Sequence, residues 1–167
     1  MDVKRRNFLT GRRSAPPPPR PPWSVDEETF VRDCTRCGDC ISRCPTGILM
    51  SGDGGFPQVS FQVDGCTLCG ECGEVCLPGV IRLKNDNKPW PWVAEVADQC
   101  LSLNQVVCRT CSEQCDAGAI RFRLQLGGMA TPEIDTELCT GCGTCLAPCP
   151  SQSIRLAPLS RSPKVQP

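Results

Sequence analysis

The chain contains no histidine and no tyrosine, and aromatic residues make up only 5% of its 167 positions. The absence of histidine excludes mixed Cys/His zinc sites and Rieske-type ligation of iron. It also removes the most common general base, so neither a Ser/His nor a Cys/His nucleophile pair can be written. Ordinary hydrolytic mechanisms therefore lose their usual parts.

Large apolar side chains are scarce, whereas residues that form turns are abundant: the chain has 17 prolines and 15 glycines. A chain of this composition cannot bury a broad apolar core. The 16 cysteines must supply the missing cross-links, as disulfides or as metal ligands. No apolar segment is long enough for a transmembrane helix.

The cysteines fall into four groups, three of which repeat the spacing C-x2-C-x2-C-x3-C. The regular groups are Cys34, Cys37, Cys40 and Cys44; Cys66, Cys69, Cys72 and Cys76; and Cys139, Cys142, Cys145 and Cys149. The first and last are followed by proline, whereas Leu77 precedes Pro78 after the second. This run holds [4Fe–4S] clusters in bacterial ferredoxins. Disulfide scaffolds do not repeat it, and zinc ribbons use separated C-x2-C pairs. Three clusters are therefore predicted.

The spacing also predicts which cysteines share a cluster. A cubane takes one thiolate on each of its four irons, and in two-cluster ferredoxins the fourth cysteine of each run binds the other cluster. Carried over, this rule gives one site of Cys34, Cys37, Cys40 and Cys76 and a second of Cys66, Cys69, Cys72 and Cys44. Two runs then form one cross-linked module.

The third group is irregular. Cys108, Cys111 and Cys115 preserve the second half of the run, but position 105 is Gln and the nearest upstream cysteine is Cys100. A cluster is compatible with this gap if residues 101–107 form a loop. The crossing rule then predicts one site of Cys100, Cys108, Cys111 and Cys149 and another of Cys139, Cys142, Cys145 and Cys115. The alternative is a degenerate group, which would leave three clusters instead of four.

The groups are spaced as a doubled unit that is itself doubled. The second cysteines, Cys37, Cys69, Cys108 and Cys142, lie 32 and 34 residues apart within each half, and equivalent positions lie 71 and 73 apart between halves. We predict a small, loop-rich α+β fold of two tandem 2[4Fe–4S] ferredoxin-like modules. The predicted parts are a disordered, basic, proline-rich arm (1–22), a first module (23–83), a linker (84–98), a second module (99–157) and a flexible tail (158–167).

A few elements can be placed within this plan. Ser24 and Glu27 fit a capping box, which predicts a short helix before the first cysteine group. Alternating apolar residues predict strands at 59–63 and 120–124. Trp90 and Trp92, in the predicted linker, are expected to fill the seam between the modules.

Charge is balanced over the chain but unevenly distributed. The first 22 residues carry six basic residues against Asp2, a net +5, and the remainder carries 12 basic against 17 acidic residues, a net −5. The basic residues are Lys4, Arg5, Arg6, Arg12, Arg13 and Arg20. Two interpretations stay open: a solvated arm, or an arm that docks on an acidic partner. Nucleic acid is a weaker option, because the remainder is acidic and has no recognisable binding motif.

The same N-terminal segment bears on localisation. Residues 4–10 look like a twin-arginine export signal, but an export signal continues with an apolar stretch of about 7–15 residues. Here Gly11, Arg12 and Arg13 follow, and then four prolines. We therefore expect the protein to stay in the cytoplasm, where clusters and thiols survive better.

Several of these features together resemble the NapF family of ferredoxin-type proteins of bacterial periplasmic nitrate reductase systems. The resemblance is carried by Arg5-Arg6-x-Phe8-Leu9-Thr10-Gly11-Arg12, Arg20-Pro21-Pro22-Trp23-Ser24, Cys34-Thr35-Arg36-Cys37 and Cys108-Arg109-x-Cys111-x3-Cys115. It runs from the N-terminus to about Ile154. Cluster motifs alone would suit many ferredoxins, whereas the opening segment and the irregular third group are specific.

The resemblance implies a cytoplasmic partner of the catalytic subunit of periplasmic nitrate reductase, in its precursor form. The implied role is maturation of that subunit before export, through supply of iron–sulfur units or electrons. The alternatives are a general low-potential electron-transfer ferredoxin and an electron-transfer subunit of an oxidoreductase complex. We do not expect an enzyme, because clusters ligated by four thiolates leave no open coordination site.

Overall fold

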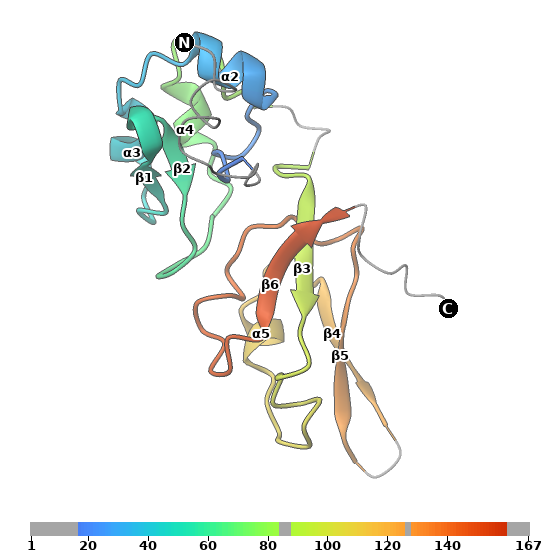
Figure 1. Ribbon diagram of the computed structural model, residues 1–167. Helices are drawn as coiled ribbons and strands as arrows, with labels where there is room; N and C mark the ends of the chain where they lie inside the picture. Colours follow the sequence, from blue (N-terminus) through green and yellow to red (C-terminus); the bar gives the residue numbers. More distant parts are fainter. Residues whose placement is uncertain (1–16, 84–87, 126–127, 160–167) are drawn as a thin grey trace, which may run out of the picture.

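The computed structural model describes residues 17–83, 88–125 and 128–159. Short elements are joined by loops, and the longest is a helix of seven residues. In chain order they are α2 (Glu27–Asp33), α3 (Asp39–Arg43), β1 (Leu49–Ser51), η1 (Asp53–Gly55), β2 (Pro57–Val59), α4 (Glu71–Glu74), β3 (Trp92–Val96), α5 (Thr110–Glu113), β4 (Ile120–Leu124), β5 (Ala130–Ile134) and β6 (Ile154–Pro158). Figure 1 shows two bodies, one holding the elements up to α4 and the other those from β3 onward. Among the described helices, none has the length and apolarity to cross a bilayer.

The first module is closed by two antiparallel pairings. Strands β1 and β2 form a hairpin in which Leu49 lies opposite Val59. The two ends of the module also meet, because the N–H of Val25 donates to the carbonyl of Val80 at 3.0 Å and Ser24 bridges to Ile81. The module's first and last segments are thus held side by side.

The second module repeats this plan with longer strands. Its hairpin consists of β4 and β5, and its first and last strands, β3 and β6, pair antiparallel from Trp92 opposite Pro158 to Val96 opposite Ile154. Strand β3 lies inside the segment predicted as linker (84–98), so residues 92–96 belong to the second sheet instead. The backbone therefore shows the internal repeat that the cysteine spacing predicts.

Helix α2 begins later than the capping-box prediction places it. Its N-cap is Asp26, whose carboxylate accepts a hydrogen bond from the N–H of Thr29 at 3.0 Å. Ser24 instead lies in the bridge to Ile81, and its hydroxyl donates to the carbonyl of Pro21. The capping-box assignment to Ser24 is therefore wrong, although the helix exists and buries Phe30.

The two predicted strands have different outcomes. The strand at 120–124 is confirmed as β4. The strand at 59–63 is not formed, because β2 ends at Val59 and the chain turns away. The ring of Phe61 contacts Trp90 edge-on with centroids 5.8 Å apart, whereas Val63 is exposed.

Part of the predicted disordered arm is packed onto the first module. Residues 1–16 lie outside the described residues, but Pro21 and Pro22 are fully buried. The carbonyl of Pro19 accepts a hydrogen bond from the N–H of Val59 at 2.8 Å, which extends the β1–β2 pairing. Arg20 forms a salt bridge with Glu27. The prediction of disorder for residues 1–22 is thus wrong for residues 17–22.

At the other end, β6 ends at Pro158, one residue into the predicted tail. The N–H of Leu159 donates to the carbonyl of Pro91 at 3.0 Å, and residues 160–167 lie outside the described part of the chain.

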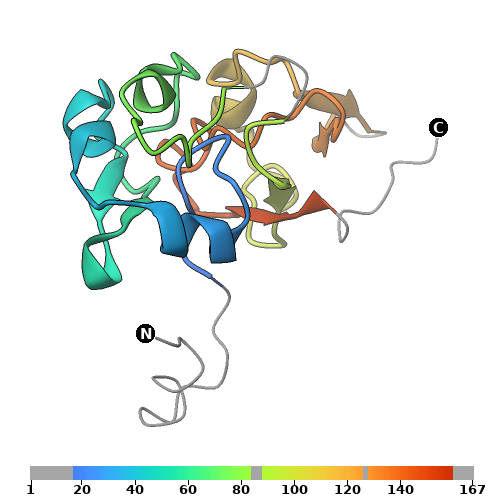
Figure 2. The same ribbon diagram turned by 90° about the horizontal axis from the view of Figure 1, so that it is seen from above.

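Each module has a small apolar core that includes cysteines. One core gathers Phe30, Ile48, Leu49, Val59, Val80, Ile81 and Trp90 with Cys40 and Cys72; the other gathers Val93, Ala94, Ala119, Ile120 and Ile154 with Cys111, Cys139 and Cys145. Trp90 belongs to the first core and Trp92 stacks on it with ring centroids 5.4 Å apart. The two indoles therefore fill the seam between the modules, as predicted, since Trp92 also donates to the carbonyl of Gly141. Figure 2 shows the two modules side by side.

Candidate iron–sulfur sites

One turn occurs four times, after the last cysteine of each group. The residue three positions beyond that cysteine has a left-handed backbone and donates its N–H to the cysteine's carbonyl, at distances from 2.9 to 3.2 Å. These residues are Gly47, Gly79, Gly118 and Gln152. Because the irregular third group makes the same turn through Gly118, Cys115 is structurally equivalent to Cys44, Cys76 and Cys149.

The first cavity, site A, lies beneath α2. It is lined by Cys34, Cys37, Cys40 and Cys76. Apolar side chains complete the wall, among them Phe30, Val80 and Ile81. Three cysteines of one run thus share a cavity with the last cysteine of the next run, which is the combination that the crossing rule predicts.

The second cavity, site B, has the reciprocal set. It is lined by Cys66, Cys69, Cys72 and Cys44. Pro22 and Trp23 also line it, together with Ile48 and Leu49. Pro22 and Trp23 were not among the predicted site residues. In the sequence these two residues stand out only as the end of the proline-rich run, which is also one of the segments that carry the family resemblance.

In the second module the sets are those that the crossing rule predicts, and neighbouring thiols agree with them. The thiols of Cys139, Cys142 and Cys115 lie close enough to Cys145 to act on its ionisation. This set is called site C. The thiols of Cys100 and Cys108 act likewise on Cys111, and these three form site D. The predicted fourth member of site D, Cys149, packs against the same apolar core as Cys111.

The lengthened gap in the third group is a folded loop. Residues 101–105 form consecutive turns, as the cluster hypothesis requires. The amide of Asn104 donates to the carbonyls of Asp98 and Cys100, at 2.7 and 2.9 Å, and the Ser102 hydroxyl donates to the carbonyl of Ala130. Cys100 itself is buried at 8% exposure. The loop therefore carries Cys100 into the module beside Cys111.

Burial makes several thiols hard to ionise. The third cysteine of every group has a raised pKa because of burial and neighbouring thiols: about 11 for Cys40 and Cys111, and about 12 for Cys72 and Cys145. Burial also acts on Cys44 and Cys149, but hydroxyl and backbone hydrogen bonds outweigh it and lower the pKa of both. A metal ligand must be a thiolate, so cluster assembly has to displace protons from the buried thiols.

The donor sets fit iron–sulfur clusters better than zinc. All sixteen cysteines are described, and each is a free thiol. In the described part of the chain, no three Cys, Asp or Glu side chains converge closely enough to hold one metal ion. A tetrahedral zinc site needs four ligands around a single ion, whereas a cubane spreads its four thiolates over separate irons. The four cysteines set around each of the cavities of sites A and B are the second arrangement.

Backbone amides also point at cysteine sulfurs. The N–H groups of Leu68, Ala94 and Ser153 donate at 3.4 Å to the Sγ atoms of Cys66, Cys139 and Cys149. Such bonds stabilise thiolate charge and influence cluster potential.

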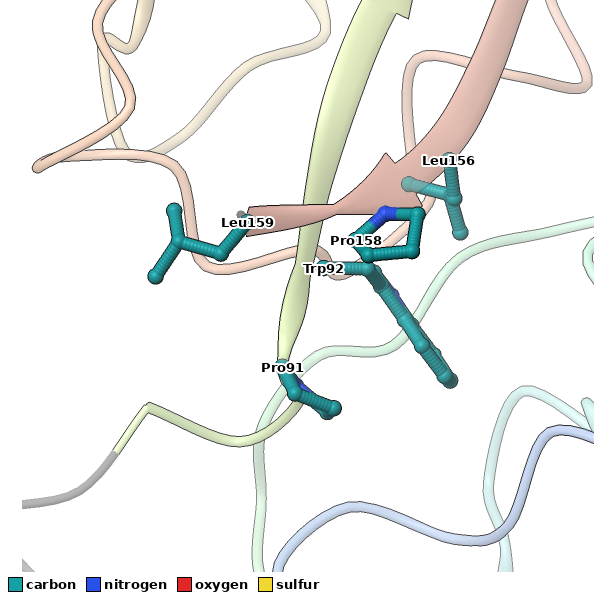
Figure 3. Close-up of a pocket in the computed structure, with 5 residues that line it drawn as sticks. All are labelled: Pro91, Trp92, Leu156, Pro158 and Leu159. Carbon is teal, nitrogen blue, oxygen red and sulfur yellow. The ribbon is translucent and has the colours of Figure 1, made fainter. Parts of the chain in front are cut away.

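An apolar groove lies apart from these sites, where β6 ends beside β3. Figure 3 shows its lining, Pro91, Trp92, Leu156, Pro158 and Leu159. These side chains include no thiol or carboxylate, so the groove is not the metal site.

Comparison with known proteins agrees with this arrangement. The 4Fe-4S dicluster domain family matches residues 33–80 and 106–153, one match per module. The ferredoxin-type protein NapF of Haemophilus influenzae is 50% identical over 143 residues, which cover 86% of this chain and 81% of that protein. NapF of Escherichia coli K12 is 41% identical over 155 residues, covering 92% and 94%. The chain belongs to the NapF family. A further relative, a subunit of an ion-translocating oxidoreductase complex of Methanosarcina acetivorans, is 35% identical over 134 residues, 74% of this chain and 46% of that relative.

Membership of the NapF family, with two dicluster domains, supports an iron–sulfur electron-transfer role. The second domain match begins at residue 106, so it includes Cys108, Cys111 and Cys115 but not Cys100. Cys100 thus lies outside the family match, and the turns of residues 101–105 place it in site D.

Proposed function

We propose that this protein assists maturation of the catalytic subunit of periplasmic nitrate reductase in the cytoplasm, before that subunit is exported. It would do so by supplying electrons or iron–sulfur units to the precursor. The observation that carries the proposal is the position of Cys37 and Cys69, each of which is exposed although the other three cysteines that line its cavity are buried or half-buried. Sites A and B thus each have one edge that a docked client can reach.

We further propose that each of the sites A to D holds one [4Fe–4S] cluster, four in all. Bound clusters supply one-electron chemistry. The residues of the chain bind and tune them: the cysteine thiolates hold the irons, amides such as that of Leu68 donate to the sulfurs, and Phe30, Val80 and Ile81 exclude water from site A. With Cys149 as the fourth ligand of site D, each cluster would have four thiolates and no coordination position open for a substrate, which favours a carrier over an enzyme.

The client would be recognised in part by charge. Arg20 was counted with the basic arm, but it is 12% exposed and bound to Glu27, so it is not available to a partner. The remaining basic residues of the arm are Lys4, Arg5, Arg6, Arg12 and Arg13. Charges of one sign that are gathered on a short segment attract an acidic surface and accelerate docking.

Co-purification with the nitrate reductase precursor tests this role. We expect the full-length protein to be recovered with the unexported catalytic subunit, and the Arg12→Glu/Arg13→Glu variant to lose most of that complex at unchanged iron content. The matched control is Arg121→Glu/Arg123→Glu, which reverses two charges on β4. Failure to recover any complex with fully loaded wild-type protein would refute the maturation role.

The alternative is a general electron carrier or an electron-transfer subunit, and the similarity to a subunit of an ion-translocating oxidoreductase complex favours it. A carrier without a specific client should be replaceable in cells by another low-potential ferredoxin. A maturation factor should not be, so complementation of a deletion strain separates the two functions.

A further inference from the structure

We propose that the two modules form one continuous electron path, and that its inter-module step crosses from site B to site C through the contact between Cys66 and Cys142. The proposal rests on the clusters of the proposed function but not on its client.

The contact joins the backbones of two predicted cluster ligands directly. The N–H of Cys66, in site B, donates to the carbonyl of Cys142, in site C, at 2.8 Å. A single hydrogen bond thus links a ligand of one module to a ligand of the other, whereas sites A and D have no such contact among the described hydrogen bonds.

The backbones approach this closely because glycine occupies the seam. A Cβ atom on Gly65 would lie 2.5 Å from the Cα and N of Thr144, and one on Gly143 would lie 2.4 Å from the ring of Phe61. Gly65 has no left-handed backbone that would itself call for glycine, so space is the reason for the residue. Gly65 and Gly143 therefore leave room for the two cluster loops to meet, because neither residue has a side chain.

Aromatic rings pack against the same seam. The indole N–H of Trp92 donates to the carbonyl of Gly141 at 3.1 Å, and the ring stacks on Trp90, which in turn contacts Phe61. Electronic coupling falls steeply with distance and passes better through covalent and hydrogen bonds than through gaps. A direct hydrogen bond between two ligand backbones meets both requirements.

The step balances as a one-electron exchange. An external one-electron reductant, dithionite in the experiment below, reduces one module. One electron then leaves that module, which is reoxidised, and enters the other, which is reduced. No bond forms or breaks and no proton is required. Sites A and D lie beyond the step on either side, so the electron can enter by one module and leave by the other.

The test uses the full-length, anaerobically loaded protein and the Gly65→Ala variant, whose new methyl group must force the seam apart. Gly52→Ala is the matched control, because a Cβ there meets only the flexible side chain of Gln58. In the dithionite-reduced state we expect spin–spin broadening between the modules in the EPR spectra of wild type and control. Gly65→Ala should lose that component while the interaction within each module persists. After pulsed photoreduction, electron redistribution should be at least several-fold slower in Gly65→Ala.

Identical EPR spectra and redistribution rates for Gly65→Ala and Gly52→Ala, at equal iron content, would overturn the proposal. If Gly65→Ala loses iron, Trp92→Phe replaces it, because this variant removes the indole N–H that donates to Gly141 and keeps an aromatic ring at the position. It should then slow redistribution at full iron content, and an unchanged rate would count against the path. Recovery of the nitrate reductase precursor is scored separately, so failure of the path and failure of the maturation role are distinguishable.

Discussion

The guanidinium of Arg20 holds the carboxylate of Glu27 with two parallel hydrogen bonds, from Nε to Oε2 at 2.8 Å and from Nη2 to Oε1 at 2.6 Å. The same guanidinium donates to the carbonyl of Pro57 and lies over the ring of Phe30, 4.9 Å from its centroid. A planar, bidentate pair of this kind is well suited to a half-buried position. It fastens the segment that places Pro22 over site B.

Arg20→Ala should therefore destabilise the first module by about 2 kcal/mol, because a half-buried pair loses its buried partner and the aromatic contacts are lost with it. We also expect faster loss of the cluster in site B, since the Pro22 cover is released. The measurement is the decay of visible cluster absorbance in anaerobic denaturant. The control is Arg32→Ala, which breaks the exposed pair with Asp33 and should cost much less, because solvent screens that pair. Equal effects of the two variants would contradict the role given to Arg20.

Cys100→Ser tests whether site D is a cluster site. We expect the variant to lose about four irons and four acid-labile sulfides per chain, one cluster's worth, because a cubane requires a thiolate on each iron. Cys108→Ser should give the same loss, and Val107→Ser, which places a new hydroxyl on an exposed neighbour, should give none. Anaerobic iron and sulfide analysis with EPR reads the result. Full iron content in Cys100→Ser would show that the third group does not use this residue.

Gln152 is the one non-glycine residue in the repeated turn, with φ of +49°. A left-handed backbone costs a residue with a side chain roughly 1–2 kcal/mol, and the greater entropy of unfolded glycine offsets part of that. Gln152→Gly should therefore stabilise the second module by roughly 0.5–1 kcal/mol. The reciprocal Gly118→Gln should destabilise it by a similar amount, since nothing lies within 4 Å of a Cβ at Gly118 and only the backbone is strained. Changes of the same sign in both variants, measured by denaturant midpoint, would contradict this account.

Removing iron should unfold the protein. Both apolar cores include cysteines among their buried residues, and few large apolar side chains support them. Metal-binding energy is then folding energy, as in other small metal-dependent domains. We expect anaerobic chelation to abolish the near-UV circular dichroism of the tryptophans, and to remove the cooperative thermal transition. A cooperative transition in the iron-free protein would show that the apolar cores suffice.

The cysteine spacing predicted the parts of the site that depend only on local sequence. The runs that begin at Cys34 and Cys66 are local, whereas the exchange of Cys44 and Cys76 between sites A and B was predicted from the rule for two-cluster ferredoxins. Strand β4 was also predictable, because its alternation is not interrupted.

The remaining features depend on contacts between distant segments. Ser24 has a good capping sequence, but its pairing with Ile81 leaves Asp26 to cap α2. Residues 92–96 resemble a linker until β6, about 60 positions later, pairs with them. The burial of Pro21 could not be predicted from a proline-rich run, because it depends on the salt bridge between Arg20 and Glu27.

The exchange of fourth cysteines between runs has a consequence for biosynthesis. Site A needs Cys76 as well as Cys34, Cys37 and Cys40. A nascent chain therefore cannot complete site A, although it contains the first cysteines made, until both runs of the first module have left the ribosome. By then site B is complete as well, because Cys44 was made earlier. The two sites of the first module thus become ready for iron at nearly the same moment of translation, and a truncated chain that stops before Cys76 has no complete site A.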